Sequence, residues 1–242
     1  MELKRVVVTG LGALTPVGNN VAETWENLVN GVSGAGPITH FDTTNFKTKF
    51  ACEVKNFKVN EHLDRKEARK MDLYTQYAIV AAKEAIEDSA MDLDKVDKNK
   101  IGVIYGVGIG GLNTLEEELF NYALNKDTMG PKFNPFFIPK MIADIASGHI
   151  SIMYGFHGPN FTTTSACASS SNAIADAFNY IRLGKANVIV AGGAEAAICP
   201  GGVGGFNAMH ALSTRNDDPT RASRPFSASR DGFIMAEGAG CL

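Results

Sequence analysis

The sequence FTTTSACASSSNAIADAFNYIRLG, residues 161–184, carries the pattern from which the fold class follows. It opens with a β-branched run, Phe161–Thr164, which predicts a strand. A run rich in alanine and serine, Ala168–Leu183, predicts a helix that ends at Gly184. This stretch therefore predicts a strand, a tight turn and a helix, with Cys167 in the turn.

Apolar runs on both sides of this unit repeat the alternation of strands and helices. The other predicted strands are Arg5–Gly10, Ile101–Gly106 and Val188–Ala191, and a further strand begins near Gly238. The other predicted helices are Thr24–Asn30, with Trp25 and Leu28 facing inward, Lys66–Ser89, Asn113–Leu124 and Lys140–Tyr154. Strands and helices in alternation predict an α/β layered fold.

The composition excludes several classes of protein. The chain has 242 residues, of which 45% are hydrophobic and 20% charged, as in globular proteins. The net charge of −3 gives no electrostatic reason to expect nucleic acid. The longest smooth apolar run, Val188–Ala191, is too short to cross a membrane, and the N-terminus lacks a signal-peptide core. Four cysteines without a C-x-x-C pair argue against a disulfide scaffold or a zinc ribbon, so we expect a cytoplasmic protein.

Cys167 is the strongest candidate for a reactive group. The predicted helix begins directly after it, and the dipole and free N–H groups of a helix N-terminus favour a thiolate. The same N–H groups can hold the oxyanion that forms during acyl transfer to a thiol. The pattern alone leaves a buried structural cysteine as an equal alternative. Cys52 and Cys241 are expected in the core, and Cys199 is assigned no role.

Three other features are each open to an ordinary structural explanation. The spacing of the five histidines suggests no metal site, and neither His149 nor His157 is singled out as a base for Cys167. The glycine-rich residues 106–111 resemble a dinucleotide loop, but a tight turn with close backbone packing is the preferred interpretation. The basic cluster of Lys66, Arg69 and Lys70 is either a solvated helix face or a docking site for an acidic partner.

Several separated motifs resemble those of the type II β-ketoacyl-acyl carrier protein synthases, in the same order. The resemblance runs from Arg5 to Leu242. The motifs are VVVTGLG at residues 6–12, TPVG at 15–18, RK at 65–66, MD at 71–72, GIGGL at 108–112, NPFFIP at 134–139, ACAS at 166–169, LSTRN at 212–216 and RDGF at 230–233.

The resemblance implies a thiolase-like fold with α-β-α-β-α layers, in which residues 1–242 form the N-terminal half with no second domain. It implies that Cys167 takes an acyl chain from acyl carrier protein. Malonyl-acyl carrier protein then loses CO2 and attacks the acyl-cysteine, giving a 3-oxoacyl product in fatty-acid elongation. No metal or organic cofactor is implied, and the expected assembly is a homodimer that binds neither nucleic acid nor membrane.

Further residue roles follow from the same resemblance. Ile109, Phe137, Gly202 and Phe206 are expected at or near the acyl pocket, Phe137 by approaching across the dimer. Lys66, Arg69, Lys70 and Lys132 are expected to receive the carrier protein. Pro131 and His210 stand where the family often has basic docking residues, so the docking footprint is expected to be weaker.

The resemblance also implies that several catalytic residues of the family are absent from the chain, and it leaves two alternative functions open. The family's two catalytic histidines, its active-site lysine and its gating phenylalanine lie beyond the matched motifs. The chain resembles a truncated half, and we expect it not to condense substrates alone. The alternatives are a polyketide-type ketosynthase and a non-catalytic partner subunit that resembles a chain-length factor, although such subunits usually replace the nucleophile that Cys167 supplies.

Overall fold

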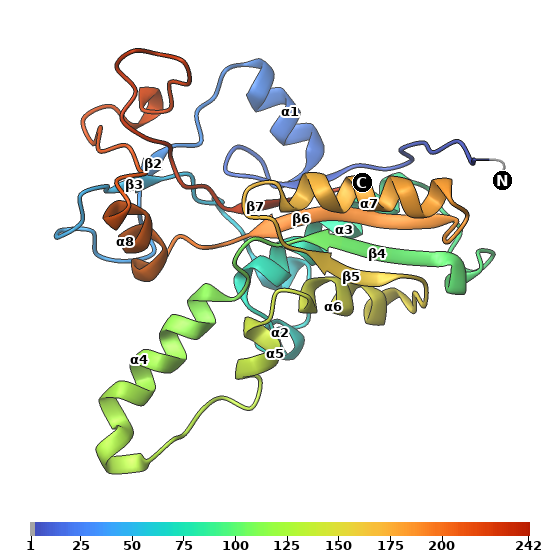
Figure 1. Ribbon diagram of the computed structural model, residues 1–242, viewed down its shortest axis with the longest axis horizontal. Helices are drawn as coiled ribbons and strands as arrows, with labels where there is room; N and C mark the ends of the chain where they lie inside the picture. Colours follow the sequence, from blue (N-terminus) through green and yellow to red (C-terminus); the bar gives the residue numbers. More distant parts are fainter. Residues whose placement is uncertain (1–2) are drawn as a thin grey trace.

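The computed structural model describes residues 3–242 and shows an α/β architecture built on a five-stranded mixed sheet (Figure 1). The strand order is β1-β7-β6-β4-β5, and β2 and β3 form a separate two-stranded ribbon. The strands are β1 (Gly12–Leu14), β2 (Gly36–Pro37), β3 (Phe50–Ala51), β4 (Ile101–Gly106), β5 (Asn160–Thr163), β6 (Val188–Glu195) and β7 (Gly238–Cys241). The helices are α1 (Val21–Val29), α2 (Arg65–Ala68), α3 (Leu73–Asp88), α4 (Leu112–Met129), α5 (Phe137–Met141), α6 (Ile145–Tyr154), α7 (Ser169–Arg182) and α8 (Pro200–Ala208).

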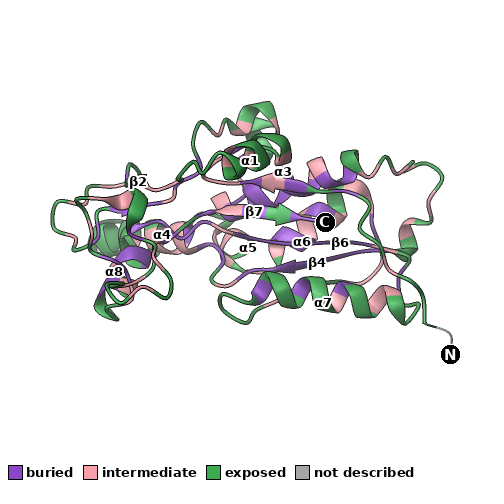
Figure 2. Cartoon of the chain, turned by 90° about the horizontal axis from the view of Figure 1, so that it is seen from above, coloured by how far each residue is buried: buried purple, intermediate pink, exposed green. Residues whose placement is uncertain are grey.

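The two faces of the sheet are covered by different helices. Alternate side chains of a strand point to opposite faces, and β4 follows this rule. Val103 and Tyr105 join a buried cluster with α3 and α6, whereas Ile104 packs with Ala173 and Ala177 of α7. The described residues therefore form three layers, α3 and α6, the sheet, and α7, and the predicted α/β layered class is confirmed. Figure 2 shows the burial along the central strands and the exposed outer side of α7.

Strands β4, β5 and β6 are parallel, so their carboxyl ends meet at one end of the sheet. Gly106 at the end of β4 pairs with Thr163 of β5 and with Gly193 of β6. Ligands of parallel α/β sheets bind beyond these carboxyl ends. The predicted strands Ile101–Gly106, Phe161–Thr164 and Val188–Ala191 and the strand near Gly238 are present, with β6 extending to Glu195.

The predicted strand Arg5–Gly10 is wrong in position, because only Gly12–Leu14 pairs with a neighbour. In the antiparallel register Gly12 lies opposite Cys241, and no strand of the described residues pairs with residues 5–10. Extended chain becomes a strand only when a neighbour completes the ladder. Residues 5–10 form no strand, Gly10 lies close to the backbone of Ala85 in α3, and Lys4 donates its backbone N–H to the Arg182 carbonyl at 3.0 Å.

The prediction that Trp25 and Leu28 face inward is also wrong. Helix α1 has no buried residue, and these side chains are 67% and 56% exposed. Polar contacts orient the helix instead. Thr24 lies 3.0 Å from the Thr15 hydroxyl, and Asn27 donates to the Val17 carbonyl at 2.6 Å.

The predicted helix Lys66–Ser89 is divided into α2 and α3 at Asp72. The Asp72 side chain caps α3 by accepting from the Tyr74 N–H, and its other oxygen accepts from the N–H and hydroxyl of Thr114 at 3.0 and 2.6 Å. One buried carboxylate thus holds the first turns of two helices. The stripe predicted for this segment is buried, comprising Met71, Tyr74, Ala78, Ala81, Ala82 and Ala85.

Three other helix predictions need correction. Lys140–Tyr154 is divided into α5 and α6, because Ile142 takes an extended conformation with ψ 137°. Helix α4 runs beyond Leu124 to Met129, and α8 forms in a glycine-rich stretch for which no helix is predicted. Among the described residues, no helix has the length and hydropathy needed to cross a membrane.

Candidate active site

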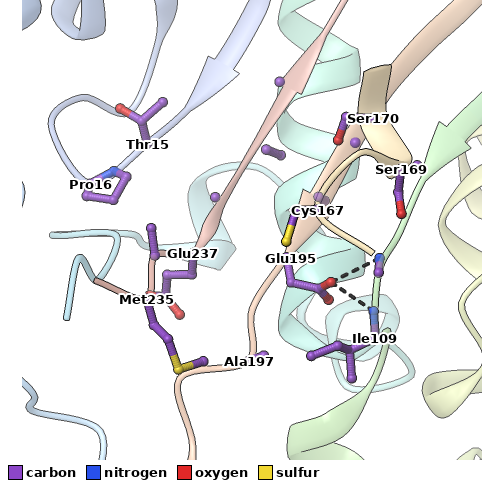
Figure 3. Close-up of a pocket in the computed structure, with 18 of the residues that line it drawn as sticks. Thr15, Pro16, Ile109, Cys167, Ser169, Ser170, Glu195, Ala197, Met235 and Glu237 are labelled. Atoms are coloured by element: carbon purple, nitrogen blue, oxygen red, sulfur yellow. Dashed lines mark hydrogen bonds between the residues drawn. The ribbon is translucent and has the colours of Figure 1, made fainter. Parts of the chain in front are cut away.

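A cavity of about 670 Å³ lies at the carboxyl ends of β4 and β6, beside the N-terminus of α7 (Figure 3). Its lining comes from several elements that are distant in sequence. The lining includes one thiol, two carboxylates and two large apolar side chains, which belong to Cys167, Glu195, Glu237, Ile109 and Phe206. Most of the remaining lining is small or apolar, as in pockets that hold an apolar ligand around a few polar groups.

The turn that carries Cys167 is held by the hydroxyl of Ser169. Ala166 adopts a left-handed conformation with φ 52°, which costs a non-glycine residue about 1–2 kcal/mol. The Ser169 hydroxyl donates to the Ala166 carbonyl at 2.7 Å and accepts from the Ser165 N–H at 2.9 Å. The strained backbone is therefore fixed by a buried side chain two residues beyond the thiol.

Two glycines allow α7 to sit close to the sheet. Gly106 and Gly193 are partners in the ladder between β4 and β6. A Cβ at Gly106 would overlap the backbone of Ser169, and a Cβ at Gly193 would overlap the Ser170 side chain. The first turn of α7, and with it Cys167, therefore rests directly on the strands.

Cys167 is exposed and lies directly before Ala168, the N-cap residue of α7. No residue in the described range 3–242 accepts a hydrogen bond from the Cys167 N–H. The helix dipole and this free N–H both favour negative charge near the thiol. The predicted strand–turn–helix arrangement is present, and the alternative of a buried Cys167 is wrong.

The side chain of Glu195, at the end of β6, reaches into the glycine-rich loop that follows β4. Its Oε2 accepts from the N–H groups of Gly108 and Ile109 at 3.0 and 2.8 Å, and its Oε1 accepts from Gly110 at 3.2 Å (Figure 3). Successive backbone N–H groups of this kind form an anion-binding nest. Because the chain's own carboxylate fills the nest, the loop does not offer these N–H groups to a dinucleotide phosphate, and the preferred interpretation as a tight turn is confirmed.

Glu237 joins the cavity to a buried polar cluster. Its Oε1 accepts from the Val54 N–H at 2.9 Å and the Tyr77 hydroxyl at 3.1 Å, and lies 3.1 Å from His40 Nε2. The hydrogen bond to Glu237 raises the pKa of His40, with further support from the charge of Glu53. Burial raises the pKa of Tyr77, so its hydroxyl keeps its proton and acts as a donor.

The structure brings Ile109 and Phe206 to the cavity with Cys167, but not Phe137 or Gly202. Phe137 stacks on Phe133 with ring centroids 5.3 Å apart. Gly202 is buried in α8, where a Cβ would overlap the carbonyl of Ala197, a residue that does line the cavity.

The four predicted docking residues do not form one continuous helix face. Lys66 of α2 and its C-cap residue Arg69 are exposed, whereas Lys70 forms an ion pair with Glu67 and lies 5.9 Å from the Phe136 ring centroid. Lys132 is exposed on the segment that follows α4. The Lys70 ammonium group is therefore less available to a partner, because it already contacts Glu67 and Phe136.

The other cysteines and the histidines have local roles. Cys241 is buried as predicted, Cys52 is half-buried, and burial raises the pKa of the buried Cys199 to about 12. No histidine lines the cavity among residues 3–242. Within the same residues no group of three histidine, cysteine or acidic side chains is arranged to hold a metal ion.

Sequence reasoning missed Glu195 and Glu237 as lining residues. Glu195 ends the buried strand β6, and Glu237 directly precedes β7. An acidic residue at the end of an otherwise buried strand is an available signal for Glu195, since burial of an acid requires hydrogen-bond donors. No comparable signal exists for Glu237, because its partners come from three distant segments.

Comparison with known proteins shows similarity along the whole chain. Residues 3–242 match the family description "Beta-ketoacyl synthase, N-terminal domain". The chain is 48% identical to a 3-oxoacyl-[acyl-carrier-protein] synthase 2 of Synechocystis, over 100% of this chain and 58% of that protein. It is also 48% identical to a protein of the same name from Staphylococcus aureus, over 99% of this chain and 57% of that protein.

Solved structures agree with the sequence comparisons. A β-ketoacyl synthase from Burkholderia phymatum superposes with a TM-score of 0.87 at 31% identity, covering 99% of this chain and 58% of that one. A structure described as the ishigamide ketosynthase/chain length factor gives a TM-score of 0.85 at 28% identity, with the same coverage. The chain thus spans less than two thirds of the length of these relatives.

Proposed function

The chain belongs to the β-ketoacyl synthase family as its N-terminal domain, and from this membership we propose that it supplies the nucleophile of a fatty-acid-elongating condensing enzyme. The Cys167 thiolate attacks the thioester carbonyl of an acyl-acyl carrier protein. The thiolate of the carrier protein leaves and takes up the proton that the Cys167 thiol gave up, and the acyl chain stays on the Cys167 sulfur. In the whole protein, malonyl-acyl carrier protein then loses CO2, and its carbanion displaces the Cys167 sulfur to give a 3-oxoacyl product.

One observation carries this proposal: an exposed cysteine with a free backbone N–H lies at the N-terminus of α7, in a largely apolar cavity. The N–H is placed to stabilise the oxyanion of the tetrahedral intermediate. Ile109 and Phe206 border the same cavity, and we assign them contact with the acyl chain. Gly202 acts indirectly, since its missing side chain leaves room for the Ala197 backbone.

The remaining roles concern assembly and carrier protein. We assign Phe137 to the acyl pocket of a second copy of the chain, because it lies outside the cavity of its own. Lys66, Arg69, Lys70 and Lys132 are assigned to docking of the acidic carrier protein, with Lys66, Arg69 and Lys132 the principal contacts because they are exposed. Electrostatic attraction of this kind speeds association and weakens with salt.

The test is acylation of Cys167, followed by intact-protein mass spectrometry. Wild-type protein incubated with an acyl-N-acetylcysteamine thioester gains one acyl group, and Cys167→Ser is expected to lower the rate by at least about a hundredfold, because a serine hydroxyl has no comparable activation here. Cys52→Ser is the matched control and retains the wild-type rate. An unmodified Cys167 in folded wild-type protein would contradict the proposal and favour a non-catalytic partner subunit.

A second arm of the experiment uses acyl carrier protein as donor. Lys66→Glu lowers the rate of acylation from the carrier protein but not from the small thioester. Lys95→Glu, at an exposed cation that pairs with Asp92, is the control for charge reversal. Equal effects of the two variants would refute the docking assignment while leaving the nucleophile intact.

A further inference from the structure

The backbone N–H groups of the loop that carries Ile109 depend on a single side chain for an acceptor. The N–H groups of Gly108, Ile109 and Gly110 have no acceptor among residues 3–242 except the Glu195 carboxylate. The segment before the loop is held by Thr164, whose hydroxyl donates to the Val107 carbonyl at 3.0 Å. The segment after it is held by the bond from the Gly111 N–H to the Met141 carbonyl at 3.0 Å. Glu195 thus anchors the middle of a loop whose two ends are fixed independently.

The loop lies close to the nucleophile's turn and borders the cavity. A Cβ built at Gly108 would lie 3.5 Å from the Ala166 carbonyl oxygen, and Gly110 takes φ +87°. Ile109, between these glycines, is 44% exposed and lines the cavity with Phe206 and Cys167. A change in the loop therefore moves an apolar wall of the cavity beside the thiol.

The carboxylate is compatible with an apolar ligand, because both of its oxygens are occupied. A buried charge is costly unless it is hydrogen-bonded, and here three N–H groups converge on it. Burial raises the pKa of Glu195, while these N–H groups act in the opposite direction. The carboxylate is thus directed at the loop and away from an acyl chain.

From this geometry we propose that Glu195 is a positioning residue that sets the acyl-chain-length preference of the cavity by fixing Ile109. The inference rests on the proposed function, since it assumes that Cys167 accepts acyl groups. A fixed Ile109 limits the length of chain that the cavity admits. Release of the loop removes this limit without removing the nucleophile.

The variants are chosen to grade the loss of the anchor. Glu195→Gln keeps one oxygen acceptor and turns an NH2 group toward the N–H groups at the other position, so the anchor is halved. Glu195→Ala removes it entirely. Asp88→Asn is the matched control, because Asp88 also accepts a backbone N–H, from Leu11 at 2.9 Å, but does not line the cavity.

The experiment compares Cys167 acylation by hexanoyl, decanoyl and tetradecanoyl N-acetylcysteamine thioesters in the full-length protein. Pocket contacts of about one methylene change selectivity by roughly tenfold or more. We therefore expect the tetradecanoyl-to-hexanoyl rate ratio to rise by about tenfold in Glu195→Ala and by less in Glu195→Gln, with Asp88→Asn unchanged. A purely structural role would lower all three rates together.

The outcomes separate this inference from the proposal on which it rests. If wild-type protein is not acylated by any of the thioesters, the proposed function is overturned and this inference with it. If wild type is acylated and both Glu195 variants keep its rate ratio, only the positioning role is overturned. Glu195→Gln, which preserves side-chain volume, decides the question if Glu195→Ala fails to fold.

Discussion

At the scale of single residues, carboxylates that are fully or partly buried organise this protein more than its cations do. Asp72 caps α3 and holds Thr114, Glu195 holds the loop of Ile109, and Glu237 joins β7 to His40 and Tyr77. Each carboxylate bonds to segments far apart in sequence. Exposed ion pairs such as Lys58–Glu61 contribute little by comparison, about 0–1 kcal/mol each.

The pair of His40 and Glu237 makes stability depend on pH. The pKa of His40 is raised above 6.5 in the folded protein. Protonated His40 therefore stabilises the fold at pH values below 6.5. That contribution is lost as the pH rises through the raised pKa, when Nε2 no longer carries the charge that faces Glu237 and Glu53. The difference in melting temperature between wild type and His40→Gln is thus expected to be largest near pH 6 and to shrink by about pH 9.

The control for this measurement is His210→Gln, at an exposed histidine that pairs with no carboxylate in the described residues. Its melting-temperature difference from wild type is expected to stay level over the same range. A His40→Gln difference that grows with pH would contradict the assigned sign.

At the scale of elements, the helix that follows Cys167 is positioned by missing side chains. Gly106 and Gly193 leave room for the first turn of α7, and Ser169 fixes the turn before it. The backbone of Ser169 cannot rotate away as a flexible side chain does. A methyl group at Gly106 therefore has to displace the helix.

Gly106→Ala is expected to destabilise the protein by about 1–3 kcal/mol, the usual cost of overpacking. It should also slow Cys167 acylation, because the N–H of Cys167 moves with α7. Chemical denaturation and the mass-spectrometric assay measure the two effects. Gly205→Ala, at a position in α8 with open space around it, is the control. Equal stability of the two variants would show that α7 tolerates the displacement.

The elements also show what sequence reasoning reaches and where it stops. Strands such as Ile101–Gly106 are predicted correctly, because burial on both faces leaves a continuous apolar run. The inward Trp25 and the unbroken helix from Lys66 are wrong, because side-chain polar contacts that the apolar pattern does not show decide both cases. Cys167, Ile109 and Phe206 are reached through motifs, whereas Glu195 and Glu237 need the folded chain to show which donors surround them.

At the scale of the whole molecule, α4 extends away from the layered body, and the segment after it returns to α5 (Figure 1). Apolar side chains are exposed on α4, where Phe120 is 62% exposed, and on α6 in the layered body, where Ile152 is 78% exposed. Exposed apolar patches of this kind mark interaction sites. The region Phe136–Tyr154 is the place where we expect association of two copies.

Ile152→Lys tests this expectation, because burying a lysine in an interface is unfavourable. Sedimentation velocity is expected to show that self-association weakens by about tenfold, or roughly 1.4 kcal/mol. Phe226→Ser, at an almost fully exposed aromatic on another loop, is the control. Unchanged association in Ile152→Lys would place the interface elsewhere. A wild-type protein that stays monomeric would show that there is no such interface.

The glycine pair beneath α7 has a consequence for protein engineering. The distance of the thiol from the strands is set by the absence of side chains at Gly106 and Gly193, which belong to different strands. Transplanting the Cys167 turn into another α/β scaffold therefore requires carving a matching depression into two host strands. A graft of the loop sequence alone would leave the sulfur too far from the sheet, however faithfully the loop itself is copied.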